Sequence, residues 1–170
     1  MKRIHSFEPL ARPHAHTLIL GSMPGRESLR QARYYAHPRN CFWPVICELL
    51  CLQKHDYPAT VKSVVQLGYA IWDVLHSCSR ASSLDSDIVE STIRPNDFAS
   101  FFVAHPRIRR VFFNGAKAEA LYRRHVLPDL PTEFQDLFYR RLPSTSPAHA
   151  AMTLEEKRQA WRKILAEPTT

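Results

Sequence analysis

The sequence predicts an α/β protein, a three-layer αβα sandwich built on a short, mainly parallel central sheet. Two strand–turn–helix units indicate this class, one at residues 17–33 and one at residues 109–125. In each unit, a short apolar run with β-branched or aromatic residues ends at a turn and is followed by a helical pattern. Strands that alternate with helices favour a parallel sheet with helices on both faces. A length of 170 residues is enough for one core, so we expect a single domain over residues 1–170.

The first strand is expected at residues 17–22, where the apolar run meets turn-forming residues. Helices are expected where apolar residues recur at helical spacing or where a capping residue begins the pattern. They are predicted at residues 43–52, 58–67, 97–104, 116–125 and 154–166, with a short helix or loop at 25–33. A buried apolar segment is predicted at 68–75, and two further strands at 109–114 and 135–141. We expect loops at residues 1–16, 77–87 and 142–150, and a capping box formed by Thr153 and Glu156.

The composition favours an anionic partner and argues against a membrane protein. Lys and Arg total 23 against 16 Asp and Glu, which gives a formal net charge of +7. Such a balance suits a polyanion such as nucleic acid, although charge alone does not identify one. No apolar run reaches the ~18 residues that span a bilayer, and residues 1–7 lack the apolar core of a signal peptide. We therefore expect a cytoplasmic protein with no membrane partner and with reduced cysteines.

Two groups of residues could ligate a metal, and neither has the spacing of a metal site. The cysteines contain no Cys-x-x-Cys pair, so we interpret them as small core residues. They are Cys41, Cys47, Cys51 and Cys78. Asp85 and Asp87 lie in a segment rich in Ser and Asp, where these residues usually cap or turn the chain. We expect neither a metal nor a cofactor.

The stretch from residue 18 to residue 43 predicts a site for a flat, polar ligand. A strand that ends in the turn from Gly21 to Gly25 places free N–H groups at the carboxyl edge of the sheet. Open α/β sheets usually bind their ligands at that edge. Two tyrosines, Asn40, a Phe and a Trp follow closely, and aromatic rings beside a side-chain amide suit a nucleobase. Asn114 adds a second amide at the end of another predicted strand.

The chain resembles the uracil-DNA glycosylase superfamily in four regions that occur in the expected order. Gly-Ser-Met-Pro-Gly at 21–25, with Tyr-Ala-His-Pro-Arg-Asn-Cys-Phe-Trp at 35–43, is similar to its first motif region. Residues 68–75 resemble the next core segment, 111–117 the base-binding strand and turn, and 142–150 the second motif. The resemblance covers residues 17–150. It is closest to the hypoxanthine-DNA (deoxyinosine) glycosylases and the mismatch-specific uracil/thymine glycosylases.

The resemblance implies a monofunctional enzyme that hydrolyses the N-glycosidic bond of a deaminated base flipped out of double-stranded DNA. Hypoxanthine is the expected base, with uracil or a mismatched base as alternatives. Asn40 is implied as the catalytic amide. Residues implied to bind the base are Ser22, Met23, Tyr35, Phe42 and Asn114. Residues implied to contact DNA are Pro143, Ser144, Thr145, Ser146, Pro147, His149, Arg26, Arg140 and Arg141. We expect a monomer.

Two positions depart from the pattern of the uracil-specific and mismatch-specific members. Met23 stands where the mismatch-specific enzymes carry an Asn that is thought to orient the attacking water, and a thioether is a poor hydrogen-bonding group. Leu142 stands where uracil-specific members keep a histidine. The hypoxanthine branch also lacks the first Asn, and there the Asn that matches Asn40 is regarded as the catalytic amide, so the resemblance implies this role for Asn40.

Simpler interpretations of these residues remain open at this point. Asn40 could cap a helix, and Asn114 could be a turn residue. Tyr34 and Tyr35 are neighbours that cannot share one face of a strand, so at most one of them should stack on a ligand. Arg26 and its neighbours Arg30 and Arg33 could contact phosphate or form a solvated face.

Two other functions are compatible with the sequence. One is a nucleic-acid-binding module of the same fold without turnover, suggested by the apolar Met23 and Leu142. The other is an α/β enzyme that acts on a free nucleoside or nucleotide. The basic balance and the small-residue loop at 142–150 argue against the second.

Overall fold

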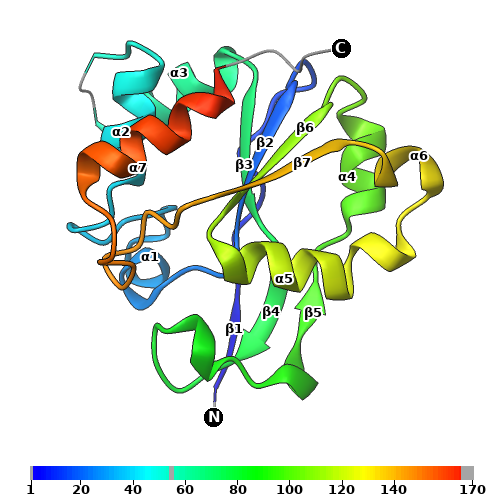
Figure 1. The fold of residues 1–170 in the computed structure, drawn as a ribbon. Helices are drawn as coiled ribbons and strands as arrows, with labels where there is room; N and C mark the ends of the chain where they lie inside the picture. The colour runs from blue at the N-terminus through cyan, green and yellow to red at the C-terminus, as the bar shows by residue number, and fades with distance from the viewer. Residues whose placement is uncertain (1, 54–55, 166–170) are drawn as a thin grey trace.

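The computed structural model describes residues 2–53 and 56–165. Its central sheet contains β2 (Thr17–Gly21), β3 (Tyr69–Asp73), β6 (Arg110–Asn114) and β7 (Phe138–Leu142). The strand order is β3-β2-β6-β7, and every neighbouring pair is parallel. Helices lie on both sides of this sheet (Figure 1). The predicted α/β class with a mainly parallel sheet is therefore confirmed.

The helices form two layers around the sheet. Figure 1 shows α1, α2, α3 and α7 to the left of the strands, α4 and α6 to the right, and α5 across the front. Their bounds are α1 Arg26–Gln31, α2 Phe42–Leu49, α3 Tyr57–Gln66, α4 Phe98–Ala104, α5 Ala116–His125, α6 Thr132–Gln135 and α7 Leu154–Trp161. Short 3₁₀ segments are η1 Asp85–Asp87, η2 Glu90–Thr92, η3 Leu127–Asp129 and η4 Arg162–Ile164.

The predicted helices agree with the structure to within a few residues. Predicted capping residues begin α4 and α7. The Asp97 carboxylate accepts a hydrogen bond from Ser100 N at 3.0 Å at the start of α4. Thr153 and Glu156 form the predicted capping box of α7. The last helix was predicted to run to Ala166, but α7 ends at Trp161 and continues as η4. Ala166 itself lies outside the described residues.

A second, antiparallel sheet was not predicted. It consists of β1 (Arg3–His5), β4 (Leu75–Ser79) and β5 (Arg94–Pro95), in the order β1-β4-β5. The predictions of a loop over residues 1–16 and of a polar connection from residue 77 are therefore wrong for these strands. β1 and β5 are three and two residues long and carry Arg, His and Pro, so they have no apolar alternation to identify them. Pairing with β4 holds them in place.

Aromatic side chains fill the core on both faces of the central sheet. On one face Trp72 packs against Phe98 and Phe101 of α4, with ring centroids 5.0 and 4.8 Å apart. On the other, Phe42 of α2 meets Trp161 of α7 edge to face at 5.8 Å. These contacts hold α2, α4 and α7 in place around the central sheet.

The cysteines fit the expected core role only in part. Cys78 is fully buried, and Cys41 and Cys47 are half-buried. Cys51 is exposed, so the core interpretation is wrong for this residue. It follows the end of α2 with a φ of 54°.

Candidate functional site

A cavity of about 570 Å³ opens at the carboxyl ends of β2, β3 and β6. Its wall is completed by the segment that joins α1 to α2 and by the loop that follows β7. All the residues that the sequence predicted for the site line this cavity except Phe42, Pro143, Arg140 and Arg141. Segments far apart in the sequence therefore meet where the parallel sheet predicts a ligand site.

Asn40 lies on the cavity wall directly before α2. Its Oδ1 accepts a hydrogen bond from Phe42 N at 3.0 Å, and its own N–H donates to His37 O at 2.8 Å. The simpler interpretation is thus partly right, because the side chain satisfies the first amide of a helix. Among the described residues, Nδ2 of Asn40 has no hydrogen-bond partner. The amide is held in a fixed plane with its donor group available to a ligand.

Asn114, at the end of β6, is tied to the loop by two hydrogen bonds to one residue. Its Nδ2 donates to Thr145 Oγ1, and its Oδ1 accepts from Thr145 N, both at 2.9 Å. An amide oxygen has two lone pairs and an amide nitrogen has two protons. One acceptor position and one donor position of Asn114 therefore remain for a ligand.

Thr145 was predicted to contact DNA, but in the structure its side chain is buried. It is 1% exposed, and besides its bonds to Asn114 its carbonyl oxygen accepts from Cys41 N at 3.1 Å. Thr145 thus joins β6, the Asn40 segment and the loop after β7. No sequence signal distinguishes it from Ser144 or Ser146, because only the folded register selects the residue that points inward.

Tyr34 and Tyr35 both line the cavity, and Phe42 lies behind Tyr35. The rings of Tyr35 and Phe42 stack with centroids 3.9 Å apart, and Phe42 is fully buried. Tyr35 has a φ of 53°, a left-handed conformation that costs a non-glycine residue about 1–3 kcal/mol. Tyr34 is buried, and its hydroxyl donates to Glu8 O at 2.9 Å.

The loop after β7 is anchored by side chains of α7. Lys157 is 6% exposed, and its ammonium donates to His149 O at 2.8 Å and more weakly to Ser146 O at 3.5 Å. Trp161 Nε1 donates to Pro143 O at 2.9 Å. The loop is therefore held at both ends, while its middle residues face the cavity.

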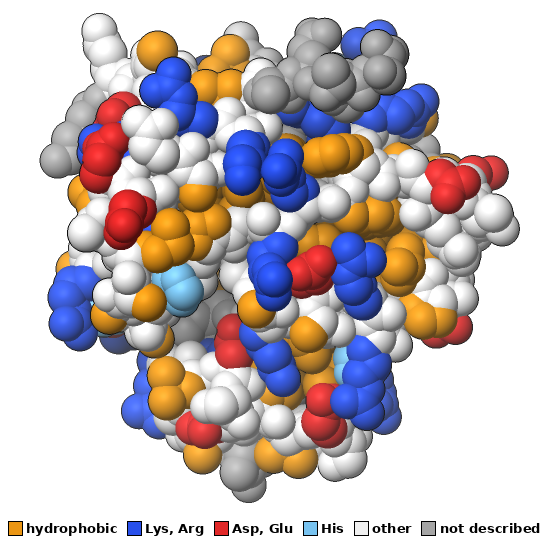
Figure 2. Space-filling model, in the orientation of Figure 1, with side chains coloured by type: hydrophobic (Ala, Val, Ile, Leu, Met, Phe, Trp, Pro, Cys, Tyr) orange, Lys and Arg blue, Asp and Glu red, His pale blue; other side chains and the backbone are white. Residues whose placement is uncertain are grey.

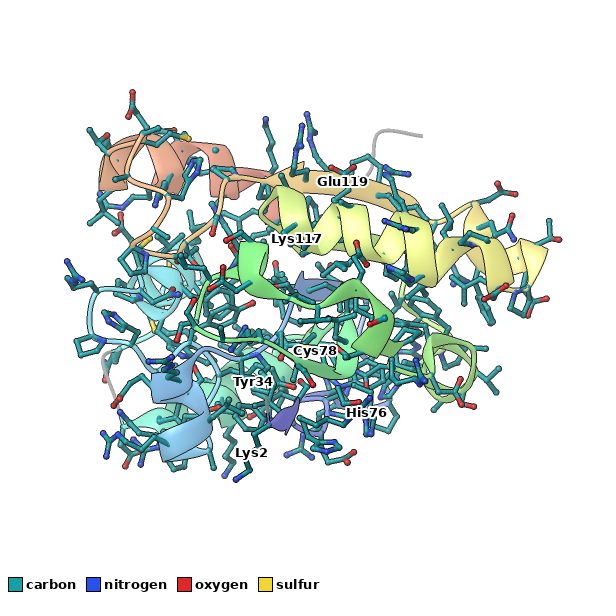
Figure 3. All side chains as sticks on the ribbon, turned by 90° about the horizontal axis from the view of Figure 1, so that it is seen from below. Lys2, Tyr34, His76, Cys78, Lys117 and Glu119 are labelled. Carbon is teal, nitrogen blue, oxygen red and sulfur yellow. The ribbon has the colours of Figure 1, made fainter. Side chains whose placement is uncertain are left out.

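The turn after β2 is held by an acidic residue and a buried arginine. Ser22 Oγ donates to Asp85 Oδ2 at 2.7 Å, and Arg80 Nη1 lies 3.8 Å from Asp85 Oδ1. Arg80 also donates from Nη2 to Pro24 O. Burial raises the pKa of Asp85, and the nearby charges of Arg80 and Lys117 oppose this rise. Figure 3 shows Lys117 at the start of α5, near the green segment that contains η1.

Asp73 is a cavity residue that sequence reasoning missed. It is the last residue of β3, is 3% exposed, and lines the cavity. Burial raises its pKa to about 7, and the charge of Asp85 adds to this effect, while the Ser6 hydrogen bond and Arg80 oppose it. The available signal was an acidic residue inside an otherwise apolar run, because a buried carboxyl is rare without a partner or a function.

Across residues 2–53 and 56–165, no cluster of three or more His, Cys, Asp or Glu side chains could hold a metal ion. Within the same part of the chain, no helix has the length and hydropathy needed to cross a membrane.

Basic side chains gather beside the cavity on the face of α5 and β7 (Figure 2). Arg140 and Arg141 of β7 are exposed, as is Arg123 of α5. Glu119 lies between two of them, with Oε2 3.4 Å from Arg141 Nε and Oε1 3.0 Å from Arg123 Nε. Arg26 is exposed at the cavity mouth and donates to Ala81 O at 2.7 Å.

Comparisons with known proteins agree with the resemblance read from the motifs. The family model of the Uracil DNA glycosylase superfamily matches residues 8–167. Proteins named hypoxanthine DNA glycosylase from Methanosarcina acetivorans and Methanosarcina barkeri are 35% and 32% identical over 114 residues, which are 66% of this chain and 71% of each relative. The solution NMR structure of a candidate uracil DNA glycosylase from M. acetivorans is similar with a TM-score of 0.77 and 27% identity, covering 97% of this chain and 100% of that one.

Proposed function

The chain belongs to the uracil DNA glycosylase superfamily, and we propose that it is a DNA glycosylase that removes hypoxanthine from double-stranded DNA. The relatives named hypoxanthine DNA glycosylase support this choice of base. The observation that carries the proposal is the convergence of Asn40, Asn114 and Tyr35 on one cavity at the carboxyl edge of the sheet. We further propose that the protein acts as a cytoplasmic monomer.

Hydrolysis of an N-glycosidic bond builds positive charge on the sugar and negative charge on the base. An enzyme gains rate by stabilising that base with fixed hydrogen-bond donors and by placing a water against the sugar. Asn40 suits this task because its amide is already oriented by Phe42 N and keeps Nδ2 free. The second lone pair of Oδ1 can hold the attacking water.

Asn114 suits the recognition of a lactam edge. Hypoxanthine presents the O6 acceptor beside the N1–H donor, and the remaining donor and acceptor of Asn114 are complementary to that pair. Adenine reverses both signs at this edge, which would leave two mispaired groups at about 1–3 kcal/mol each. Tyr35, supported by Phe42, would stack on the flipped base and offset part of the cost of unstacking.

Contact with the duplex is assigned to the loop after β7 and to the neighbouring basic face. Ser144 and Ser146 line the cavity in a loop that α7 anchors, and each hydroxyl oxygen accepts a backbone N–H of the same loop. Arg140 and Arg141 extend from the strand that leads into this loop. His149 lines the cavity, and we propose that it contacts DNA there rather than the base.

A glycosylase assay separates this function from the two alternatives. Duplexes containing hypoxanthine, uracil, xanthine or a G·T mismatch are incubated with the protein in excess chelator, and abasic product is measured. Free deoxyinosine serves as the nucleoside substrate. We expect abasic product from the hypoxanthine duplex. Binding without product favours the module without turnover, and product only from free deoxyinosine favours the nucleoside enzyme.

Two substitutions at Asn40 test its assignment separately from its helix contact. Asn40→Asp keeps an oxygen for Phe42 N but loses the amide donor and places negative charge near the departing base. Asn40→Ala loses both the acceptor for Phe42 N and the amide donor. We expect excision to fall by about 100-fold or more in both variants, because removal of one such donor typically has that effect. Wild-type turnover by a folded Asn40→Asp variant contradicts the assignment.

A further inference from the structure

Asp73 occupies the floor of the cavity, opposite Gly21 in the β2–β3 register. Its two carboxyl oxygens have different surroundings. Oδ2 accepts a hydrogen bond from Ser6 Oγ at 2.7 Å. Oδ1 has no hydrogen-bond partner among the described residues. The side chain is therefore anchored on one side and open on the other.

The hydroxyl of Tyr35 approaches the same position of the β2 backbone as this oxygen. This hydroxyl is buried and makes no hydrogen bond of ordinary geometry in the described part of the chain, although the Asn114 side chain lies near enough to oppose the rise of its pKa. A Cβ built on Gly21 would lie 2.5 Å from Asp73 Oδ1 and 3.0 Å from Tyr35 Oη. Both atoms thus approach the same point of the β2 backbone, which only a glycine leaves open. A buried hydroxyl without a partner is rare, and here it lies in a residue that lines the same cavity as Asp73, which indicates a place for a ligand.

The surroundings of Asp73 favour its neutral form. Burial raises its pKa to about 7, and Asp85 adds to the rise, whereas Arg80 is the opposing cation. Tyr34 and Tyr35, the titratable groups that face it from the segment after α1, have pKa values that burial raises, so both stay neutral. Since Oδ2 accepts from Ser6, the neutral carboxyl carries its proton on Oδ1, the oxygen that is open to the cavity.

We propose that Asp73 is a further catalytic residue, whose neutral carboxyl donates a hydrogen bond from Oδ1 to an acceptor atom of the departing base. This inference rests on the proposed glycosylase function. As the bond between C1′ and the base nitrogen breaks, its electron pair passes to the base, and the bond from Oδ1–H strengthens as that charge grows. A water oxygen forms the new bond to C1′ and releases its proton to solvent. Asp73 keeps its own proton.

The ionised form of Asp73 would act in the opposite sense. It would place a negative charge beside a base that is becoming negative and would offer no donor. Excision by the wild-type protein should therefore decline as the neutral fraction declines, which is about tenfold for each pH unit above its pKa. The predicted fall in single-turnover rate is about 20-fold between about pH 6.5 and about pH 8.5.

The test compares Asp73→Asn, Asp73→Ala and the wild type in single-turnover excision of hypoxanthine with saturating enzyme. An amide keeps an acceptor for Ser6 and a donor for the cavity at every pH. Asp73→Asn should keep the wild-type rate near pH 6.5 to within about threefold and lose the decline at higher pH. Asp73→Ala should lose about 100-fold near pH 6.5. Asp129→Asn, an exposed position on η3, is the control and should follow the wild-type profile.

The possible results separate this inference from the proposed function. A decline in Asp73→Asn parallel to that of the wild type overturns the role of Asp73, as does a wild-type rate in Asp73→Ala. Absence of abasic product from the wild type at every pH overturns the proposed function instead. Binding of each variant to an abasic-site duplex, measured alongside, should change little, because the donor acts on the departing base and not on the DNA.

Discussion

Replacement of Asp73 by Asn should change the stability of the protein in opposite directions at low and high pH. Asp73 is 3% exposed, and burial raises its pKa from 3.8 to about 7. Between these values the folded state holds a proton that the unfolded state has released, so the free energy of unfolding falls as pH rises. At about 1.4 kcal/mol per pH unit, the full loss is about 4 kcal/mol, and it is complete just above the folded pKa.

The Asn variant does not titrate and so does not suffer this loss. Its amide, however, has two N–H protons where the neutral carboxyl has one O–H, and the additional donor costs about 1–3 kcal/mol when it is buried without a partner. Near pH 4.5 this cost dominates, and the variant should be less stable than the wild type. Near pH 8 the wild type has lost about 3 kcal/mol more than at pH 4.5, so the difference should shrink and reverse.

Urea unfolding of both proteins at these two pH values measures the difference directly. Subtracting the free energy of unfolding of the variant from that of the wild type at the same pH cancels the contributions of all other titrating groups, provided that the m-values of the two proteins agree. Asp129→Asn, an exposed substitution on η3, is again the matched control, and its free energy of unfolding should stay within about 0.5 kcal/mol of the wild type. A difference between Asp73→Asn and the wild type that is the same at both pH values would refute the claim that Asp73 is neutral in the folded protein.

Two further predictions concern base recognition and DNA contact. Asn114→Asp should reduce hypoxanthine excision sharply and change binding to an abasic-site duplex much less, because a carboxylate loses the donor and repels the departing base; equal losses in both assays would mean that the residue serves only to hold Thr145 and the loop. DNA affinity should fall steeply with salt, and Arg140→Gln with Arg141→Gln should lower the slope of log K against log salt by about 2. Arg107→Gln, exposed near the amino end of β6, should leave the slope unchanged, and a slope of zero in the wild type would contradict electrostatic binding.

The central sheet was predictable because its strands are long enough to show a pattern. Every residue of β2 and β3 is buried, and such strands read as continuous apolar runs. The small antiparallel sheet was not predictable from local sequence. Arg94 and Pro95 form a strand only because β4 supplies the partner backbone. Structure that depends on a distant partner leaves little trace in a short polar segment.

The candidate site was predictable at the level of segments and less so at the level of atoms. Asn40, Asn114 and Tyr35 reach the predicted cavity, because the ends of parallel strands meet at one edge. The sequence could not show that Thr145 occupies half of the hydrogen-bonding capacity of Asn114, since this depends on the path of a loop 31 residues away. Phe42 was grouped with the base-binding residues, yet it lies behind Tyr35; its base-binding role stays a prediction.

The presence of two carboxyl groups in this cavity poses an electrostatic problem for a glycosylase. The protein carries a net charge of +7, as suits a DNA-binding enzyme, but Asp73 and Asp85 both line the place where the base becomes negative. Two ionised carboxylates there would oppose DNA binding and base departure alike. Arg80 and Ser22 compensate Asp85 directly, whereas Asp73 has only the hydroxyl of Ser6 on one oxygen. Burial favours the protonated form of Asp73 and so removes its negative charge. The protonated carboxyl no longer repels the departing base and can donate a hydrogen bond that stabilises it.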